Sequence, residues 1–168
     1  MTNHPDIIID DAVNVARAIF SPQMIDDSGY ITRAAFELRH NESYISVCQM
    51  NVGSWLDDIK AIPVNKSRTL VGYGILNSGD IRSQSFLHNE HEVVFDVVDQ
   101  HTDKNKSHAG IVFFLDGAGL RGDKEYIIKD LPADTPAKPL VLRIQSRLLK
   151  LARLHYVKWT LRDIGFYA

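Results

Sequence analysis

Short runs of β-branched and aromatic residues, separated by polar and glycine-rich stretches, dominate the middle of the chain. Such runs are typical of strands, so we predict strands over residues 44–50, 70–75, 91–98 and 108–115. The polar stretch 99–107 between the last two predicts an exposed hairpin loop. Gly72 and Gly74 leave one face of the second strand without side chains, which predicts that another segment packs closely against it.

Two other segments have the spacing of an amphipathic helix. Trp55, Ile59 and Ile62 fall on one helical face, so a short helix is predicted from residue 54 to the proline at 63. Nearer the C-terminus, a longer helix is predicted to open at Pro136, with Thr135 as its cap, and to run to about residue 155. Its apolar face consists of Leu140, Ile144, Leu148 and Leu151.

These elements indicate an α+β fold, in which a mainly antiparallel sheet is packed by a few helices, one of them an amphipathic basic C-terminal helix. The apolar segment 7–20 fits a strand and a helix equally, and its type stays open. The chain has 168 residues, of which 45% are hydrophobic and 24% charged. These values predict a single domain over 1–168, with frayed residues at 1–6.

The sequence also indicates a compartment. The single cysteine, Cys48, cannot form an internal disulfide, and the first residues lack the basic and apolar segments of a secretion signal. No apolar run approaches the ~18 residues needed to cross a bilayer. We therefore expect a soluble cytoplasmic protein that does not contact a membrane.

Charge is distributed unevenly along the chain. The net charge is −2, yet seven basic residues and no acidic residue occur between positions 138 and 162. Four of them fall within about a third of the circumference of the expected helix. We call these four the basic stripe: Arg143, Arg147, Lys150 and Arg153. The stripe predicts contact with an acidic protein partner, a second copy of the chain or nucleic acid, and a solvated outer helix face is the alternative.

Histidines and carboxylates cluster between residues 88 and 108. Imidazole and carboxylate groups bind zinc and other divalent metals, so His88, Glu90 and His91 are candidate metal ligands. His88, His91 and His108 are also candidates for acid–base catalysis. However, the segment that begins at His91 is predicted to be extended, and residues three apart on a strand face opposite sides. An edge strand and turn with polar side chains is therefore the alternative, and no cofactor is identified.

Cys48 and His108 follow one another in the order that resembles papain-like peptidases, and the segment SHAGIVFF resembles the His-bearing strand of small cell-wall peptidases. The resemblance implies that Cys48 is a nucleophile and His108 its base. Those enzymes place the cysteine at the start of a helix, where the helix dipole lowers the thiol pKa. Cys48 instead falls inside a predicted strand, so a buried, unreactive thiol is the alternative.

Two more features of the sequence are candidate ligand sites. The segment 116–122 (DGAGLRG) contains G-x-G-x-x-G after a predicted strand, as in dinucleotide-binding turns, but too few residues precede Pro132 to form the required helix. A tight loop is predicted instead, in which Gly117, Gly119 and Gly122 supply positive φ. Arg17 stands in the apolar segment 7–20, where its head group either lines a ligand cleft or reaches solvent or a carboxylate.

The sequence thus favours a non-enzymatic binding or accessory domain whose contact surface is the basic stripe. The alternative is a small metal-dependent or Cys/His hydrolase that uses the region 88–108. A third hypothesis is structural, with the stripe packed against the acidic surface of a second copy in a homo-oligomer.

Overall fold

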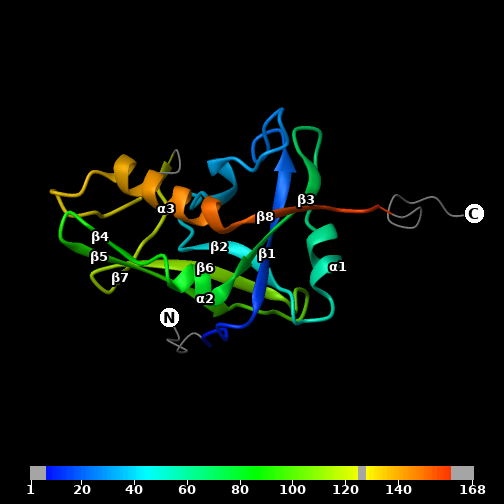
Figure 1. Ribbon diagram of the computed structural model, residues 1–168, viewed down its shortest axis with the longest axis horizontal. Helices are drawn as coiled ribbons and strands as arrows, with labels where there is room; N and C mark the ends of the chain where they lie inside the picture. The colour runs from blue at the N-terminus through cyan, green and yellow to red at the C-terminus, as the bar shows by residue number, and fades with distance from the viewer. Residues whose placement is uncertain (1–6, 125–127, 160–168) are drawn as a thin grey trace, which may run out of the picture.

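A computed structural model describes residues 7–124 and 128–159, and its main feature is an antiparallel sheet (Figure 1). The strand order is β4-β5-β6-β2-β1-β3-β8, and the short β7 pairs with β6. This arrangement, with helices packed on it, confirms the α+β class and the mainly antiparallel sheet. The strands are β1 Asn14–Ser21, β2 Tyr44–Gln49, β3 Thr69–Asn77, β4 Phe86–His88, β5 His91–Asp99, β6 His108–Leu115, β7 Ala118–Gly119 and β8 Arg153–Tyr156.

The segment of undecided type is a strand, β1, at the centre of the sheet. It pairs with β2 on one side and β3 on the other. Six consecutive residues, 15–20, are buried, because both faces of this strand are covered. A strand buried on both faces is apolar at every position and loses the alternation that would identify it. This explains why its hydrophobic pattern fitted a helix equally well.

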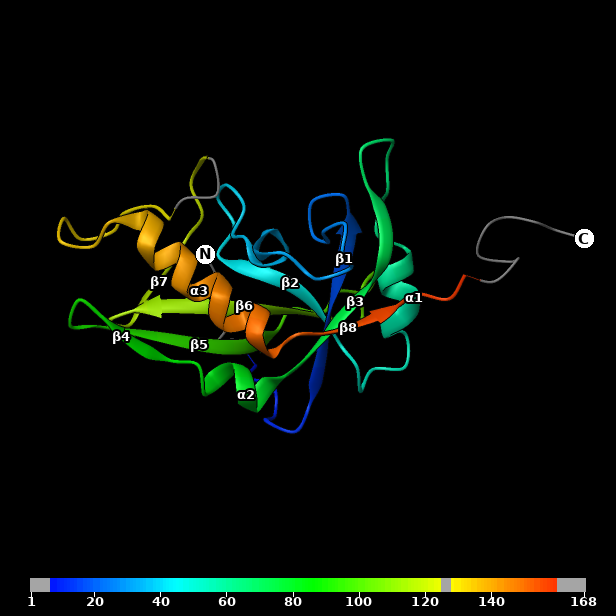
Figure 2. The same cartoon turned by 45° about the horizontal axis from the view of Figure 1, so that its top comes forward.

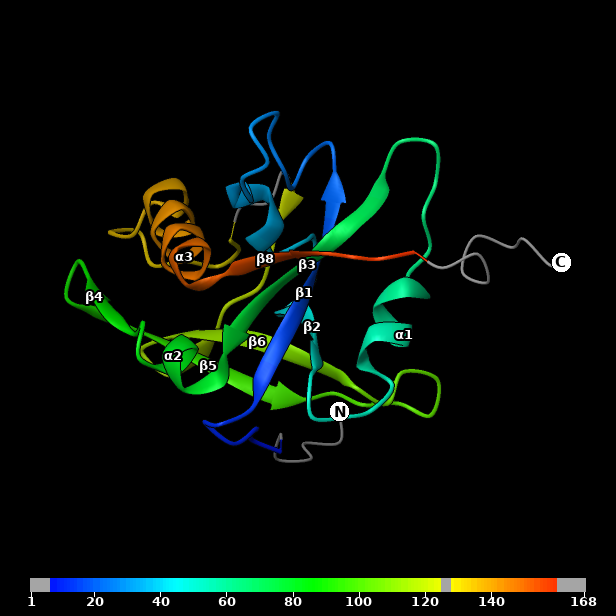
Figure 3. The ribbon, with the colours of Figure 1, turned by 45° about the vertical axis from the view of Figure 1, so that its right-hand side comes forward.

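Four helical segments pack around the sheet: the 3-10 helix η1 Arg33–Phe36, and the α-helices α1 Trp55–Lys60, α2 Ser78–Arg82 and α3 Ala137–Leu151. Figures 1 and 2 show α3 lying across one face of the sheet, over β6. Leu140, Ile144 and Leu148 are buried under it, as the helical spacing predicted. Figure 3 shows α1 on the other side of the crossing strands β1 and β3, and its Ile59 is fully buried.

The C-terminal helix ends earlier than the sequence suggested. The chain becomes extended at Ala152, with φ −71° and ψ 131°, and Arg153 begins β8 instead of continuing the helix. The physical reason is the open edge of β3, whose backbone groups gain hydrogen-bond partners from β8. A Cβ at Gly72 would collide with the His155 carbonyl, so the predicted close approach at this glycine is confirmed. Thr135 makes no capping hydrogen bond, and Pro136 occupies the cap position.

The glycine-rich segment forms a tight turn between β6 and β7. Asp116 and Gly117 have φ of 47° and 83°, as two-residue hairpin loops with positive φ require. Gly119 and Gly122 are not among the described residues with positive φ, which corrects that part of the prediction. Gly122 instead lies against the Arg39 carbonyl, where no Cβ would fit. The sequence EYIIK at 125–129 also fits a strand, but residues 125–127 of it lie outside the described residues.

Among the described residues, the helices are too short and too polar to span a membrane.

Candidate functional site

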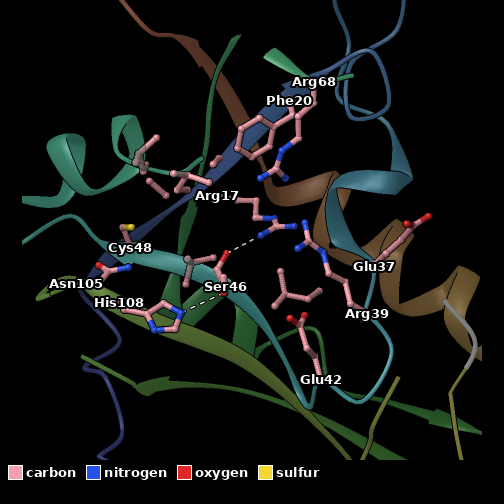
Figure 4. Close-up of a pocket in the computed structure, with 16 residues that line it drawn as sticks. Arg17, Phe20, Glu37, Arg39, Glu42, Ser46, Cys48, Arg68, Asn105 and His108 are labelled. Carbon is pink, nitrogen blue, oxygen red and sulfur yellow. Dashed lines mark hydrogen bonds between the residues drawn. The ribbon is translucent and has the colours of Figure 1, made fainter. Parts of the chain in front are cut away.

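A pocket lies where β1 and β2 meet the segment 37–42 (Figure 4). It encloses about 170 Å³, a little more than the roughly 150 Å³ cavity that accepts a benzene molecule. Its walls combine apolar side chains with an unusual number of charged and polar groups. The polar lining consists of Arg17, Glu37, Arg39, Glu42, Ser46, Cys48, Arg68, Asn105 and His108.

Arg17 lies in the middle of β1 and is only 8% exposed. Its Nε donates to the Ala35 carbonyl at 2.8 Å, and its Nη1 donates to the Ser46 carbonyl at 2.9 Å. No carboxylate in the described chain forms an ion pair with it, and its Nη2 has no protein acceptor there. Burial and the nearby Arg39 and Arg68 lower the pKa of Arg17 to about 10. Arg17 is therefore a buried cation at neutral pH with only neutral partners.

Arg39 and Arg68 add positive charge to the same space. The guanidinium of Arg68 lies 4.3 Å from the centre of the Phe20 ring and donates to the Pro63 carbonyl at 2.7 Å. Its Nε is buried without a hydrogen-bond partner. The side chain of Arg39 is exposed and forms no hydrogen bond within the described segments. Figure 4 shows the Arg17, Arg39 and Arg68 guanidinium groups directed into one space.

Two glutamates at the pocket oppose this charge in part. Glu42 favours the charged form of Arg17. Glu37 is half-buried, and burial raises its pKa, although Arg17 and Arg39 act in the opposite direction. Three guanidinium groups against two carboxyl groups leave the pocket net positive in a chain whose net charge is −2.

Ser46 and His108 form a hydrogen-bonded pair across β2 and β6. The Ser46 Oγ lies 3.1 Å from His108 Nε2, and His108 Nδ1 lies 3.2 Å from the Gln100 carbonyl oxygen. Because a carbonyl oxygen only accepts, Nδ1 holds the hydrogen in the neutral ring, and Nε2 accepts from the Ser46 hydroxyl. Three groups are therefore hydrogen-bonded in a row: the Ser46 hydroxyl, the His108 base and the Gln100 carbonyl that orients the base.

Neighbouring side chains fix the position of the histidine. Asp58 of α1 accepts hydrogen bonds from the Ser107 hydroxyl at 2.6 Å and from its backbone N–H at 3.3 Å, which anchors the residue before His108. The Tyr44 ring packs edge-on against the His108 ring, with 5.8 Å between the centres. The imidazole is thus held from its own strand and from β2.

Cys48 lies inside β2, two residues after Ser46, and is 5% exposed. Burial raises the pKa of its thiol, so the thiol stays protonated at neutral pH. The surroundings lack the helix start that activates cysteine nucleophiles. They favour the buried-thiol alternative, and a catalytic role for Cys48 stays a prediction.

The candidate metal ligands lie away from this pocket, at the β4–β5 hairpin. His88 ends β4 opposite His91, and Glu90 sits in the turn with φ 67°. The His91 imidazole is held by Asp116 at 2.6 Å and Asp134 at 3.1 Å. Within residues 7–124 and 128–159, no group of three or more His, Cys, Asp or Glu side chains is arranged to hold a metal ion.

The basic stripe divides between two elements, because Arg153 belongs to β8 while the other members lie on α3. The Arg143 and Arg147 guanidinium groups each lie 4.3 Å from the centre of the Phe86 ring. Arg143 also donates to His88 Nδ1 at 3.0 Å, and Arg147 to the Gln84 carbonyl at 3.2 Å. Both arginines therefore attach α3 to the β4 region. The stripe's role as a contact surface stays a prediction.

The sequence pairs Cys48 with His108 as a candidate nucleophile and base and offers Arg17 as a separate candidate, and the structure brings all three to one pocket. Sequence analysis did not identify Ser46, Arg39 or Arg68. Ser46 could have been found from the strand alternation, because residues two apart share a face and Ser46 precedes Cys48 by two. Arg39 and Arg68 lie outside strands and gave no such signal, since only the folding of β1 against its neighbours brings them together.

Comparison with known proteins does not place the chain in a family. It matches no family model, and no curated protein and no solved structure matches it. A function is therefore inferred from the geometry of the pocket.

Proposed function

We propose that the protein binds a small molecule carrying a carboxylate or phosphate group in the pocket of Arg17, Arg39 and Arg68. The observation behind this proposal is the buried Arg17 guanidinium without an ion-pair partner in the described chain. Burying an ion without an ion-pair partner costs free energy, and Glu42 at the same pocket offsets this cost only in part. A bound anion would offset that cost, and it would also reduce the mutual repulsion of the three arginines.

The available donors suit such an anion. Arginine presents a planar set of N–H groups that matches the oxygens of carboxylates and phosphates. Arg17 Nη2 and Arg39 have donors not used by the described residues, and Arg68 Nε is buried without an acceptor. Asn105 Oδ1 is also buried without a donor, so a hydroxyl on the ligand would satisfy it.

The size of the pocket limits the ligand. A space of about 170 Å³ accommodates a small organic acid or one phosphoryl group with a short substituent. It does not accommodate a whole nucleotide or a peptide. The proposal is therefore a metabolite-sized anion, bound at a site distinct from the basic stripe.

The test is isothermal titration calorimetry with succinate, citrate and inorganic phosphate, supported by thermal unfolding. At a ligand concentration of 100 times Kd, binding stabilises the folded state by about 2.7 kcal/mol. We expect Arg17→Gln to weaken binding at least about tenfold, as loss of a charged hydrogen bond implies. Arg33→Gln is the matched control, because Arg33 is exposed on η1 outside the pocket.

A second variant, Arg39→Gln, distinguishes loss of binding from loss of folding, because the side chain of Arg39 is exposed and contributes little to the fold. It should also bind more weakly while its unfolding temperature without ligand matches that of the unmodified protein. The proposal is wrong if none of the three anions binds, or if both pocket variants bind as tightly as Arg33→Gln.

The basic stripe supports a second, separate proposal, contact with an acidic protein or a second copy of the chain, with nucleic acid as a further candidate. Arg143, Lys150 and Arg153 are exposed, which favours it. Light scattering at about 50 and 200 mM salt tests self-association, and titration with generic DNA and RNA tests nucleic acid. Unchanged mass and no binding in either salt would exclude both.

A further inference from the structure

Building on the proposed anion site, we infer that the Ser46–His108 pair makes the pocket catalytic, and that it hydrolyses a small carboxylic ester whose acyl part bears a second carboxylate. The hydroxyl, the base and the cationic groups line the same pocket. This assignment makes Ser46 the nucleophile and His108 the general base.

The hydrogen-bond geometry fits these roles. Ser46 Oγ lies 3.1 Å from His108 Nε2, within the range in which a base removes a hydroxyl proton. The Gln100 carbonyl accepts from His108 Nδ1 at 3.2 Å, which fixes the tautomer that leaves Nε2 free to accept. The Ser46 side chain is also exposed to the pocket, so a substrate carbon could approach its oxygen.

The cationic groups fit the charge that develops during attack. Arg17 Nη1 donates to the Ser46 carbonyl at 2.9 Å, which places the guanidinium beside the nucleophile's own residue. The unused Nη2 of Arg17 is therefore available to an oxyanion formed next to Ser46. Arg39, at the exposed side of the pocket, is available to the second carboxylate of the substrate.

The chemical steps balance without a further co-reactant. The Ser46 oxygen forms a bond to the ester carbonyl carbon while its proton moves to His108 Nε2. The bond from that carbon to the leaving oxygen then breaks, and the departing alcohol takes the proton from His108. Water next attacks the acyl–serine ester with His108 as base, and the Ser46 oxygen leaves with that proton. The net reaction converts ester and water into acid and alcohol.

The same geometry selects Ser46 over Cys48 as nucleophile. The hydrogen bond to His108 comes from Ser46, and no described side-chain hydrogen bond joins His108 to Cys48. The Cys48 thiol is 5% exposed, so a substrate carbon has little access to it. His108 is thus the shared base of both possibilities, and the serine is the group it activates.

The experiment measures release of 4-nitrophenolate from mono(4-nitrophenyl) succinate and from the uncharged 4-nitrophenyl butyrate. We expect kcat/KM for the anionic ester to exceed that for the neutral one by at least about tenfold, as one charged contact implies. Ser46→Ala and His108→Gln should each lower kcat/KM by at least about a hundredfold. Ser43→Ala is the matched control, because Ser43 is exposed just before β2 and outside the pocket.

A covalent probe gives a second readout. Diisopropyl fluorophosphate should label the peptide that contains Ser46, detected by mass spectrometry, and excess succinate should slow the labelling. Ser43→Ala should keep both labelling and hydrolysis. Activity lost in Cys48→Ala and retained in Ser46→Ala would overturn the inference in favour of the thiol.

The two proposals fail in different ways. Ser46→Ala retains the anion-binding contacts, so it should still bind succinate with the affinity of the unmodified protein. Succinate binding without ester hydrolysis or labelling overturns the catalytic inference and leaves the anion site intact. Absence of anion binding in the unmodified protein overturns the proposed function on which the inference rests.

Discussion

The arginines of the pocket and those of α3 belong to the same residue type but stand in opposite electrostatic situations. Arg143 and Arg147 share the face of the Phe86 ring and donate to the histidine and carbonyl beside them. They lie at the surface, where water screens their charge. Arg17 is buried, close enough to two other arginines for its pKa to be lowered to about 10. Both sets of arginines have neutral hydrogen-bond partners, so the difference between them is exposure to water.

A dense run of basic residues and a set of arginine donors without protein acceptors thus occur in different parts of the molecule. The seven basic residues of 138–162, with no acidic residue among them, carry a charge of +7, yet two of them help to attach a helix. The pocket draws its three arginines from distant parts of the chain and leaves donors without protein acceptors in the described residues. The proposed anion site therefore rests on a buried cation without an ion pair in the described chain, and not on a run of basic residues.

The largest expected effect that separates the two regions comes from Phe86→Ala. Phe86 is buried between the two α3 arginines and Phe95, and removal of a buried phenylalanine costs about 3–5 kcal/mol in free energy of unfolding. Urea unfolding measures it, with the exposed neighbour in Leu87→Ala as control. Anion affinity of the folded variant should be unchanged. A weakened affinity would show that the two regions are coupled.

A smaller effect is expected from Arg143→Lys combined with Arg147→Lys. Lysine keeps the charge but loses the planar stacking on Phe86, worth about 0.5–1 kcal/mol for each arginine. The double variant should lower the free energy of unfolding by about 1–2 kcal/mol at unchanged net charge. Chemical denaturation checks this, and Lys138→Arg is a control on an exposed α3 residue. No loss of stability would mean that these arginines act as surface charges only.

The smallest effect, visible only as a pH dependence, is expected at His91. Hydrogen bonds donated by the His91 ring to Asp116 and Asp134 raise the pKa of His91 above its usual value of about 6.5. The stabilisation is therefore full below about pH 6.5 and is lost as pH rises through the raised pKa. The same bonds lower the pKa of both aspartates, so the contribution is lost again in acid, as pH falls through those lowered values.

The measurement is the unfolding temperature of His91→Gln and of the unmodified protein from pH 4 to pH 9. The difference should be largest near pH 5–6 and should shrink above neutrality. His155→Gln is the comparison, because His155 is an exposed histidine of β8 that forms no ion pair with a carboxylate of the described chain. A difference that grows with pH would contradict this account of the His91 contacts.

The sequence predicted much of the sheet and little of the site. The runs that became β2, β3, β5 and β6 were recognisable from composition, as was the apolar face of α3. The predicted end of α3 was wrong because the chain from Arg153 pairs with β3 as β8, and this pairing overrode the local helical preference. α2 was not predicted, because Asn77, which caps it by accepting from the Asp80 N–H, is a residue type equally typical of turns.

The site was harder to predict because its groups depend on register. Ser46 meets His108 only through the pairing of β2 with β6, which places Ser46 opposite Gly110 and Cys48 opposite His108. Arg17 becomes a candidate anion-binding residue only when its burial and the two neighbouring arginines are known. Neither the register nor the neighbourhood is encoded in the spacing of one segment.

The central position of β1 has a consequence for the lifetime of the site. Arg17 stands on a strand that pairs with β3 over its whole length and with β2 at Val15 and Ala16, so it cannot detach unless the centre of the sheet opens. Amides in such strands exchange with solvent through global rather than local unfolding. Hydrogen exchange at Arg17 should therefore be among the slowest in the protein. A pocket built on this strand is therefore preorganised, and we expect the proposed anion to bind without a change in the pairing of the sheet.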